Sequence, residues 1–172
     1  MSGTIVIVTG PPGVGKTTAA SAVAASYDRS AIVTGDHFFD ALQSGRIEPW
    51  LPESHSQNID VLDITLDTAS GYASRGWTTV LEGIFGPWFL DTITERLADH
   101  EVHYAVLMSD LERCLSRFTQ RDPGVGDDAA RKMHHEFSTA SIDAKHIIDA
   151  SGSAEATSAE LMRAIEGGRV QL

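Results

Sequence analysis

The chain has 172 residues, with 13 Lys and Arg against 24 Asp and Glu and a formal net charge of −11. This length predicts a single domain over residues 1–172, and 42% hydrophobic with 22% charged residues is ordinary for a globular protein. The acidic balance argues against a protein that coats nucleic acid, because phosphate contacts need a face rich in Lys and Arg. We therefore expect no long nucleic acid among its partners.

The cellular compartment is indicated by what the sequence lacks. One cysteine, Cys114, excludes an intramolecular disulfide and fits a reducing compartment. No apolar run approaches the ~18–20 residues of a membrane helix, and residues 1–3 lack the basic start of a signal peptide. We expect a cytoplasmic protein without a membrane partner, either a monomer or a homodimer.

Strand and helix patterns alternate along the chain. Residues 4–9 form a β-branched run without alternation, typical of a strand buried on both faces. The spacing of Thr157 and Glu160 predicts a capping box for the last helix, which ends before Gly167. The alternation predicts an α/β domain with a parallel sheet covered on both sides. The remaining predicted elements are helices over 16–26, 57–74, 111–120 and 128–137, a helix from Pro87, a break at 122–126, and strands at 31–34, 78–81, 104–108 and 147–148.

Residues 10–17 match the phosphate-loop (Walker A) pattern G-x-x-x-x-G-K-[ST] at every fixed position, between a predicted strand and a predicted helix. Glycines let backbone N–H groups turn inward around phosphate oxygens, and the helix directs its positive end at the same anion. Lys16 can reach the β- and γ-phosphates, and the Thr17 hydroxyl can bind Mg²⁺. The predicted triphosphate site consists of Gly10, Pro11, Pro12, Gly13, Val14, Gly15, Lys16, Thr17 and Thr18.

With this motif at the start of a short domain, the sequence resembles the P-loop kinases of small molecules, the group of shikimate kinase, gluconate kinase and chloramphenicol phosphotransferase. The resemblance follows the order of elements along the whole chain, and the phosphate loop is its specific part. It implies a three-layer fold with a five-stranded parallel sheet, helices on both faces and a small helical lid at about residues 113–137. It also implies ATP with Mg²⁺, and adenine contacts from the lid helix and residues 151–153.

Two carboxylates close predicted strands, at the sheet edge where α/β folds bind ligands. Asp36 matches a family position that contacts the acceptor hydroxyl; the alternative is an N-cap for a helix that starts near Phe38. Glu82 stands where P-loop enzymes place an acidic residue that holds Mg²⁺ directly or through water. The alternatives for Glu82 are a contact with the acceptor and an ion pair with an arginine.

Three arginines, Arg113, Arg117 and Arg121, lie four residues apart and share one face of the predicted helix before the break. A guanidinium binds phosphoryl oxygens bidentately and keeps its charge, so arginines suit a lid that closes on ATP. For Arg113 we favour a solvated surface position, and we predict that Arg117 and Arg121 act on the phosphates. Arg131 and Lys132 are further lid candidates.

The acceptor pocket is expected in two regions that build it in the similar kinases. Aromatic side chains with a few polar groups suit a ring-bearing or sugar-like acceptor. The alternative for both tryptophans is plain core packing. The candidate residues are Phe38, Arg46, Trp50, His55, Gln57 and Asn58 after the second strand and Trp88 and Phe89 after the third.

These residues together predict an enzyme that transfers the γ-phosphoryl group of ATP to a hydroxyl of a small metabolite or natural product. Lys16, Arg117 and Arg121 would offset charge on the transferring group, and Asp36 would orient the acceptor oxygen. One alternative is a nucleotide or RNA-end kinase. Another is an NTPase switch or regulatory ATP-binding module, although the chain has no N-K-x-D run for reading guanine.

Overall fold

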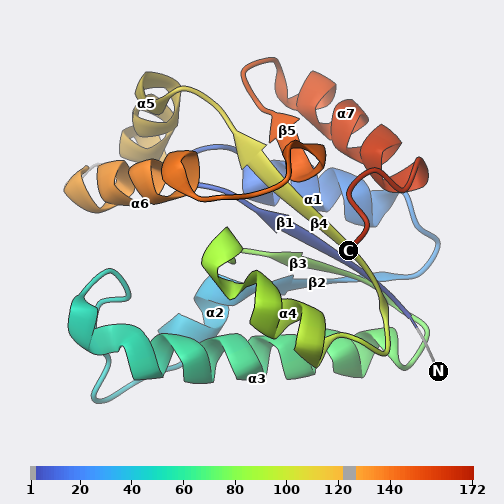
Figure 1. Ribbon diagram of the computed structural model, residues 1–172, viewed down its shortest axis with the longest axis horizontal. Helices are drawn as coiled ribbons and strands as arrows, with labels where there is room; N and C mark the ends of the chain where they lie inside the picture. Colours follow the sequence, from blue (N-terminus) through green and yellow to red (C-terminus); the bar gives the residue numbers. More distant parts are fainter. Residues whose placement is uncertain (1–2, 122–126) are drawn as a thin grey trace.

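The computed structural model describes residues 3–121 and 127–172, with Arg121 described by its backbone only. All strand pairs of its five-stranded sheet are parallel, in the order β2-β3-β1-β4-β5 (Figure 1). Because β1 is central, the phosphate loop that follows it lies in the middle of the carboxyl edge of the sheet. The strands are β1 (Thr4–Thr9), β2 (Ser30–Thr34), β3 (Thr78–Glu82), β4 (Glu101–Met108) and β5 (Ile147–Asp149).

Helices cover both faces of the sheet. The pair α1 (Lys16–Ala25) and α7 (Ala154–Glu166) packs on one face, and α3 (His55–Ala73) and α4 (Leu90–Arg96) pack on the other. Figure 1 shows the remaining helices beyond the strand ends, around the side where the phosphate loop lies. They are α2 (Gly35–Asp40), α5 (Leu111–Arg121) and α6 (Asp128–Thr139). The predicted three-layer α/β fold is confirmed.

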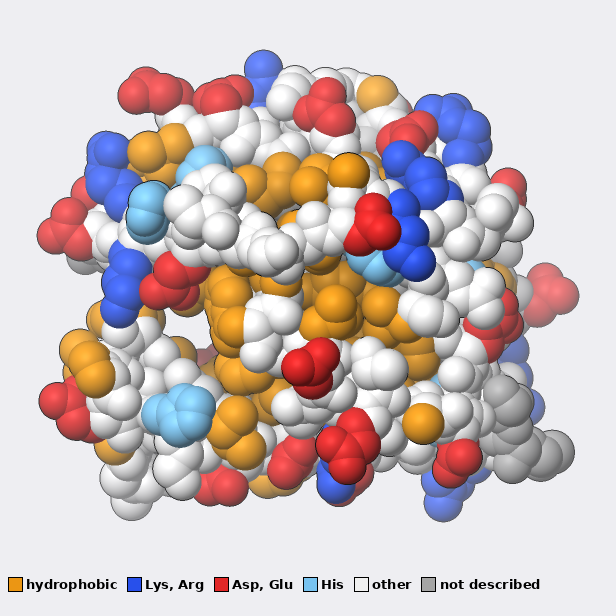
Figure 2. Space-filling view, in the orientation of Figure 1, with side chains coloured by type: hydrophobic (Ala, Val, Ile, Leu, Met, Phe, Trp, Pro, Cys, Tyr) orange, Lys and Arg blue, Asp and Glu red, His pale blue; other side chains and the backbone are white. Residues whose placement is uncertain are grey.

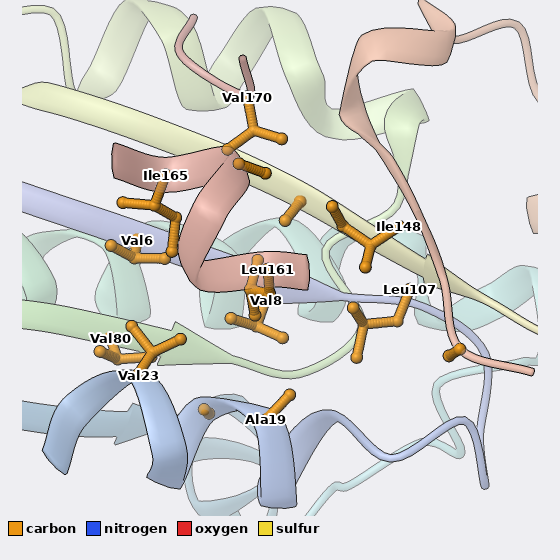
Figure 3. Close-up of a cluster of buried hydrophobic side chains, with 14 of the residues drawn as sticks. Val6, Val8, Ala19, Val23, Val80, Leu107, Ile148, Leu161, Ile165 and Val170 are labelled. Atoms are coloured by element: carbon orange, nitrogen blue, oxygen red, sulfur yellow. The ribbon is translucent and has the colours of Figure 1, made fainter. Parts of the chain in front are cut away.

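Two apolar cores explain why apolar and polar residues do not alternate along the first strand. Val6 and Val8 point into one core, with side chains of α1 and α7 (Figure 3), and Ile5 and Ile7 point into the other, against α3 and α4. All four side chains are fully buried. A central strand of a parallel sheet is covered twice, so both of its faces must be apolar.

Several element boundaries differ from the sequence prediction by one to three residues, and three of the differences have a clear cause. Strand β4 begins at Glu101 instead of 104, since Thr4 and Glu101 already pair across the sheet. Pro87 opens a 3₁₀ turn (Pro87–Phe89), and α4 follows at Leu90. The predicted capping box of α7 is wrong, because the N-cap is Ser153, whose hydroxyl accepts from the Ala156 amide. The predicted break at 122–126 lies outside the described residues. No helix in the described ranges is long and apolar enough to cross a bilayer.

Candidate active site

The phosphate loop leaves β1 at Gly10 and enters α1 at Lys16. Gly10 and Gly13 have φ of +144° and +77°, in the region that side chains with a Cβ rarely adopt. A Cβ at Gly10 would lie 2.3 Å from the Leu107 carbonyl oxygen, and one at Gly13 would lie 2.0 Å from the Cys114 carbonyl oxygen. The loop therefore rests directly on the backbone of β4 and α5. These contacts fix the path of the loop, and the backbone amides of a glycine-rich turn of this kind can bind phosphate oxygens.

Gly13→Ala should lower the free energy of unfolding by at least ~2 kcal/mol, since the new methyl group meets backbone that cannot move aside. The measurement is urea denaturation of the variant and the wild-type protein. Gly45→Ala is the matched control, because Gly45 has a similar φ of +75° but nothing within 4 Å of its added Cβ. Equal losses in the two variants would contradict the close approach of the loop to Cys114.

Three side chains with functional atoms meet at the end of this loop. Lys16 Nζ donates to the Pro11 carbonyl oxygen at 3.1 Å, so the side chain folds back over the loop. Thr17 Oγ1 donates to Glu82 Oε2 at 3.4 Å, and Glu82 is only 4% exposed. No arginine in the described part of the chain forms an ion pair with Glu82, so the alternative of an Arg–Glu pair does not hold there. The structure thus brings the two predicted metal ligands together.

Mg²⁺ fits this oxygen pair. The described residues contain no cluster of three or more His, Cys, Asp or Glu that could enclose a metal. Magnesium in nucleotide enzymes usually takes one or two protein oxygens and completes its shell with phosphates and water. The Thr17 hydroxyl and the Glu82 carboxylate would hold such an ion, which would neutralise charge on the phosphates.

Glu82→Gln should raise the Mg²⁺ concentration needed for half-maximal activity by about tenfold, because the amide oxygen carries no charge. The measurement is a titration of turnover with Mg²⁺ at saturating nucleotide. Glu160→Gln is the control, since Glu160 bonds Arg163 and Arg169 far along α7. An unchanged Mg²⁺ requirement would remove Glu82 from the metal site.

The segment after β3 is fixed by two polar side chains from the central strands. Thr9 Oγ1 accepts from the Phe85 amide at 2.9 Å, and the Tyr104 hydroxyl donates to the Phe85 carbonyl oxygen at 2.6 Å. Burial raises the pKa of Tyr104, which keeps this donor protonated. Phe85 in turn packs against Gly35, where a Cβ would lie 2.8 Å from its ring. These contacts position the start of α2, and sequence analysis missed both Thr9 and Tyr104 as positioning residues.

Asp36 is the second residue of α2. The N-cap of this helix is Thr34, so Asp36 does not cap it, and the alternative structural role is wrong. The side chain is exposed at the carboxyl edge of the sheet, next to the turn held by Phe85. No ion pair occupies it among the described residues. An accessible carboxylate on a fixed turn can accept a hydrogen bond from a ligand hydroxyl.

The predicted arginines occupy different surroundings. Arg117 Nη1 donates to the Val14 carbonyl oxygen at 3.4 Å, and its side chain is half-buried. Arg113 pairs with Asp110 and donates to the Ser151 carbonyl, which agrees with its predicted surface position. The Arg121 side chain lies outside the described residues. The structure therefore places Arg117 against the phosphate loop.

A cavity of about 230 Å³ opens beside the phosphate loop, between α1, α5 and the start of α7. Gly152 belongs to the segment from which adenine contacts are expected. The cavity adjoins the loop through Gly15 and Thr18, so a nucleotide base could lie here with its phosphates in the loop. Its lining residues are Val14, Gly15, Thr18, Ala19, Arg117, Gly152, Ala154 and Thr157.

The predicted acceptor residues lie on the opposite side of the phosphate loop. Trp50 and Trp88 are 41% and 44% exposed, so neither is a plain core residue. Phe38 packs at the margin of the second core, and Arg46 pairs with Asp40 at 3.2 Å. Figure 2 shows an opening between α6 and the region of α2 and the loop before α3.

Two of the polar candidates have structural roles in the loop of residues 41–54. Gln57 bonds both the amide and the carbonyl of Ile47, and Asn58 donates to the Pro49 carbonyl oxygen. Lys132 of α6 donates to the Trp50 carbonyl oxygen at 3.0 Å, so the loop is tied to the far wall of the opening. His55 is exposed at the first residue of α3.

A family model described as an AAA domain (AAA_18) matches residues 6–149. The chain belongs to this family. Solved structures similar to this AAA domain include an unliganded sugar kinase from Janibacter sp. HTCC2649, with TM-score 0.72, 16% identity and 95% of each chain covered. A gluconokinase from Sinorhizobium meliloti 1021 has TM-score 0.68 and 14% identity over 97% of this chain and 93% of its own.

The tunicamycin resistance protein of Deinococcus radiodurans is also similar, with TM-score 0.62 and 19% identity over 94% of this chain and 95% of its own. No match was found among curated proteins. At these identities the likeness shows the fold alone. The predicted resemblance to P-loop kinases is confirmed at that level, and the AAA domain has the α/β fold of the P-loop kinases.

Proposed function

We propose that the protein is an ATP-dependent phosphotransferase that moves the γ-phosphoryl group to a hydroxyl of a small metabolite or natural product. The observation that carries this proposal is the placement of Asp36. An accessible carboxylate without an ion-pair partner among the described residues stands at the carboxyl edge that also holds the phosphate loop. A carboxylate in this position could accept a hydrogen bond from an acceptor hydroxyl.

Each part of the reaction has candidate residues. The phosphate loop and Lys16 would hold the triphosphate, Thr17 and Glu82 would hold Mg²⁺, and Arg117 would lie along the nucleotide. Asp36 would accept a hydrogen bond from the acceptor hydroxyl, orient it toward the γ-phosphorus and receive its proton as the O–P bond forms and ADP leaves. Positioning and charge stabilisation supply most of the rate in such transfers.

The names of two similar structures support a small acceptor, since one is a sugar kinase and another a gluconokinase. The acidic character of the chain, with 24 Asp and Glu against 13 Lys and Arg, also disfavours an extended nucleic acid as substrate, because phosphate contacts need a face rich in Lys and Arg. A nucleotide or RNA end and a regulatory switch remain as outcomes that the experiment must separate.

The test is ATP turnover with Mg²⁺ against a panel of sugars, polyols, nucleosides, antibiotics and RNA ends, with mass spectrometry of the products. We expect little ATP consumption until an acceptor is added. The product should be a small alcohol of the panel with its mass raised by about 80 Da, the mass of one phosphoryl group. A product formed only from an RNA end would replace the proposed acceptor class. ATP hydrolysis that no acceptor stimulates would point to a switch and overturn the proposal.

A further inference from the structure

Four segments lie around the opening that Figure 2 shows, and we call them together the acceptor cleft: α2, residues 41–54, residues 83–89 and α6. Gly35 at the start of α2 packs on Phe85, which joins two of them. The Lys132–Trp50 hydrogen bond joins two of these walls, and Trp88 packs on Phe137 of α6 with ring centroids 5.1 Å apart. Figure 2 shows the opening between α6 and the walls below it. A separate hollow of about 320 Å³ lies between Pro87, Trp88 and the end of α6, where Glu136 and residues 139–141 line it.

Carboxylates predominate on these walls. Asp36 on α2, Glu53 in residues 41–54 and Glu136 on α6 come from three separate segments. Counting α2, residues 41–54, residues 83–89 and α6, six carboxylates stand against three Lys and Arg. An anionic acceptor would meet an unfavourable field from this side of the site. The carboxylates are Asp36, Asp40, Glu48, Glu53, Asp128 and Glu136.

The cations of the same segments already have partners. Arg46 pairs with Asp40 at 3.2 Å, and Arg131 contacts Asp127 Oδ2 through two nitrogens at 2.9 and 3.0 Å. Lys132 donates to the Trp50 carbonyl and lies 4.0 Å from Glu136. Recognition of a carboxylate or phosphate usually takes an arginine whose donors are available. Within the described part of these walls, each Lys and Arg is already paired.

Apolar surface is the other feature of the cleft walls. Trp50, Leu51 and Trp88 are 41%, 43% and 44% exposed, although large apolar side chains are usually covered. Exposed apolar groups on segments that border an opening indicate contact with a ligand that has an apolar face. The ring of such a ligand could stack on an indole, and its hydroxyl or amino groups could donate hydrogen bonds to the nearby carboxylates.

From these observations we infer that the acceptor is an uncharged or positively charged hydroxyl compound with an apolar face, and that the cleft selects against anionic acceptors. This inference rests on the proposed function and specifies its substrate class. It excludes sugar acids, other carboxylated metabolites and nucleoside monophosphates as the preferred acceptors.

The experiment compares acceptors that differ by one charged group: glucuronate, glucose and glucosamine, then uridine and uridine 5′-monophosphate. A small-molecule extract separated by ion exchange into anionic, neutral and cationic fractions extends the panel, with labelled γ-phosphate of ATP as the probe. We expect kcat/KM to favour neutral or cationic members by about tenfold. Product formed best from anionic members overturns the inference but leaves the proposed function intact. No product from any fraction overturns both.

Asp40→Asn gives a second readout, because it releases the Arg46 guanidinium inside the cleft. We expect the ratio of kcat/KM for anionic over neutral acceptors to rise about threefold or more. Asp67→Asn is the matched control, since Asp67 pairs with Arg96 at 2.6 Å on the outer side of α3 and α4. Equal ratios in the two variants would overturn the assignment of this cleft as the selective element.

Discussion

Lys16→Ala is expected to reduce phosphoryl transfer by about 10³-fold or more, since it removes the one cation that the phosphate loop itself carries. Lys16 Nζ now donates to the Pro11 carbonyl oxygen at 3.1 Å, directly over the loop. A bound triphosphate offers this ammonium stronger, charged acceptors than a carbonyl. The side chain therefore lies where the β- and γ-phosphates would be neutralised.

The assay is ATP-dependent product formation at saturating Mg²⁺, together with the melting temperature of each variant. Lys145→Ala is a matched control, because Lys145 Nζ also donates to a backbone carbonyl, that of Gln171, at 3.0 Å. We expect the control to keep wild-type turnover and both variants to remain folded. Turnover within tenfold of wild type for a folded Lys16→Ala protein would show that the loop does not hold the reacting phosphates.

The sequence predicted the elements of the fold because their patterns are local. The β-branched run of β1 and the phosphate-loop motif identify a buried strand, a turn and a helix in contiguous residues. Boundaries set by tertiary contacts were missed. The first residues of β4 have no special pattern, and they become strand because β1 pairs with them.

The same distinction applies to the site. The motif predicted Lys16 and Thr17 from spacing alone, but the contact between Thr17 and Glu82 joins residues 65 positions apart. Thr9 and Tyr104 read as ordinary strand residues, and only the sheet shows that both bond to Phe85. Their one available signal was a polar atom next to a run of apolar strand residues. The sequence also does not show whether Arg46 and Lys132 have donors available for a ligand, because this depends on Asp40 and on the Trp50 carbonyl, which the fold brings to them.

Asp36→Asn is expected to lower kcat by about 10²–10³-fold while the KM for ATP stays within about twofold of wild type. The amide has the shape of the carboxylate but cannot take the proton of the acceptor hydroxyl. Asp36 lies on α2, whereas the phosphate loop and the cavity beside Arg117 belong to other elements. Nucleotide binding should therefore be unaffected by the change.

Asp91→Asn is the control for Asp36→Asn. It tests whether activity is lost only because a short helix loses a carboxylate from its first turn. Asp91 is the second residue of α4, as Asp36 is of α2, so both changes remove one carboxylate from the first turn of a short helix. If Asp36 acts on the acceptor, kcat falls in Asp36→Asn alone, and ATP protects both variants equally against thermal unfolding. Wild-type kcat in Asp36→Asn with a good acceptor would remove the proposed base from the mechanism. A parallel rise in the KM for ATP would instead place Asp36 with the nucleotide, on the other side of the transferred group.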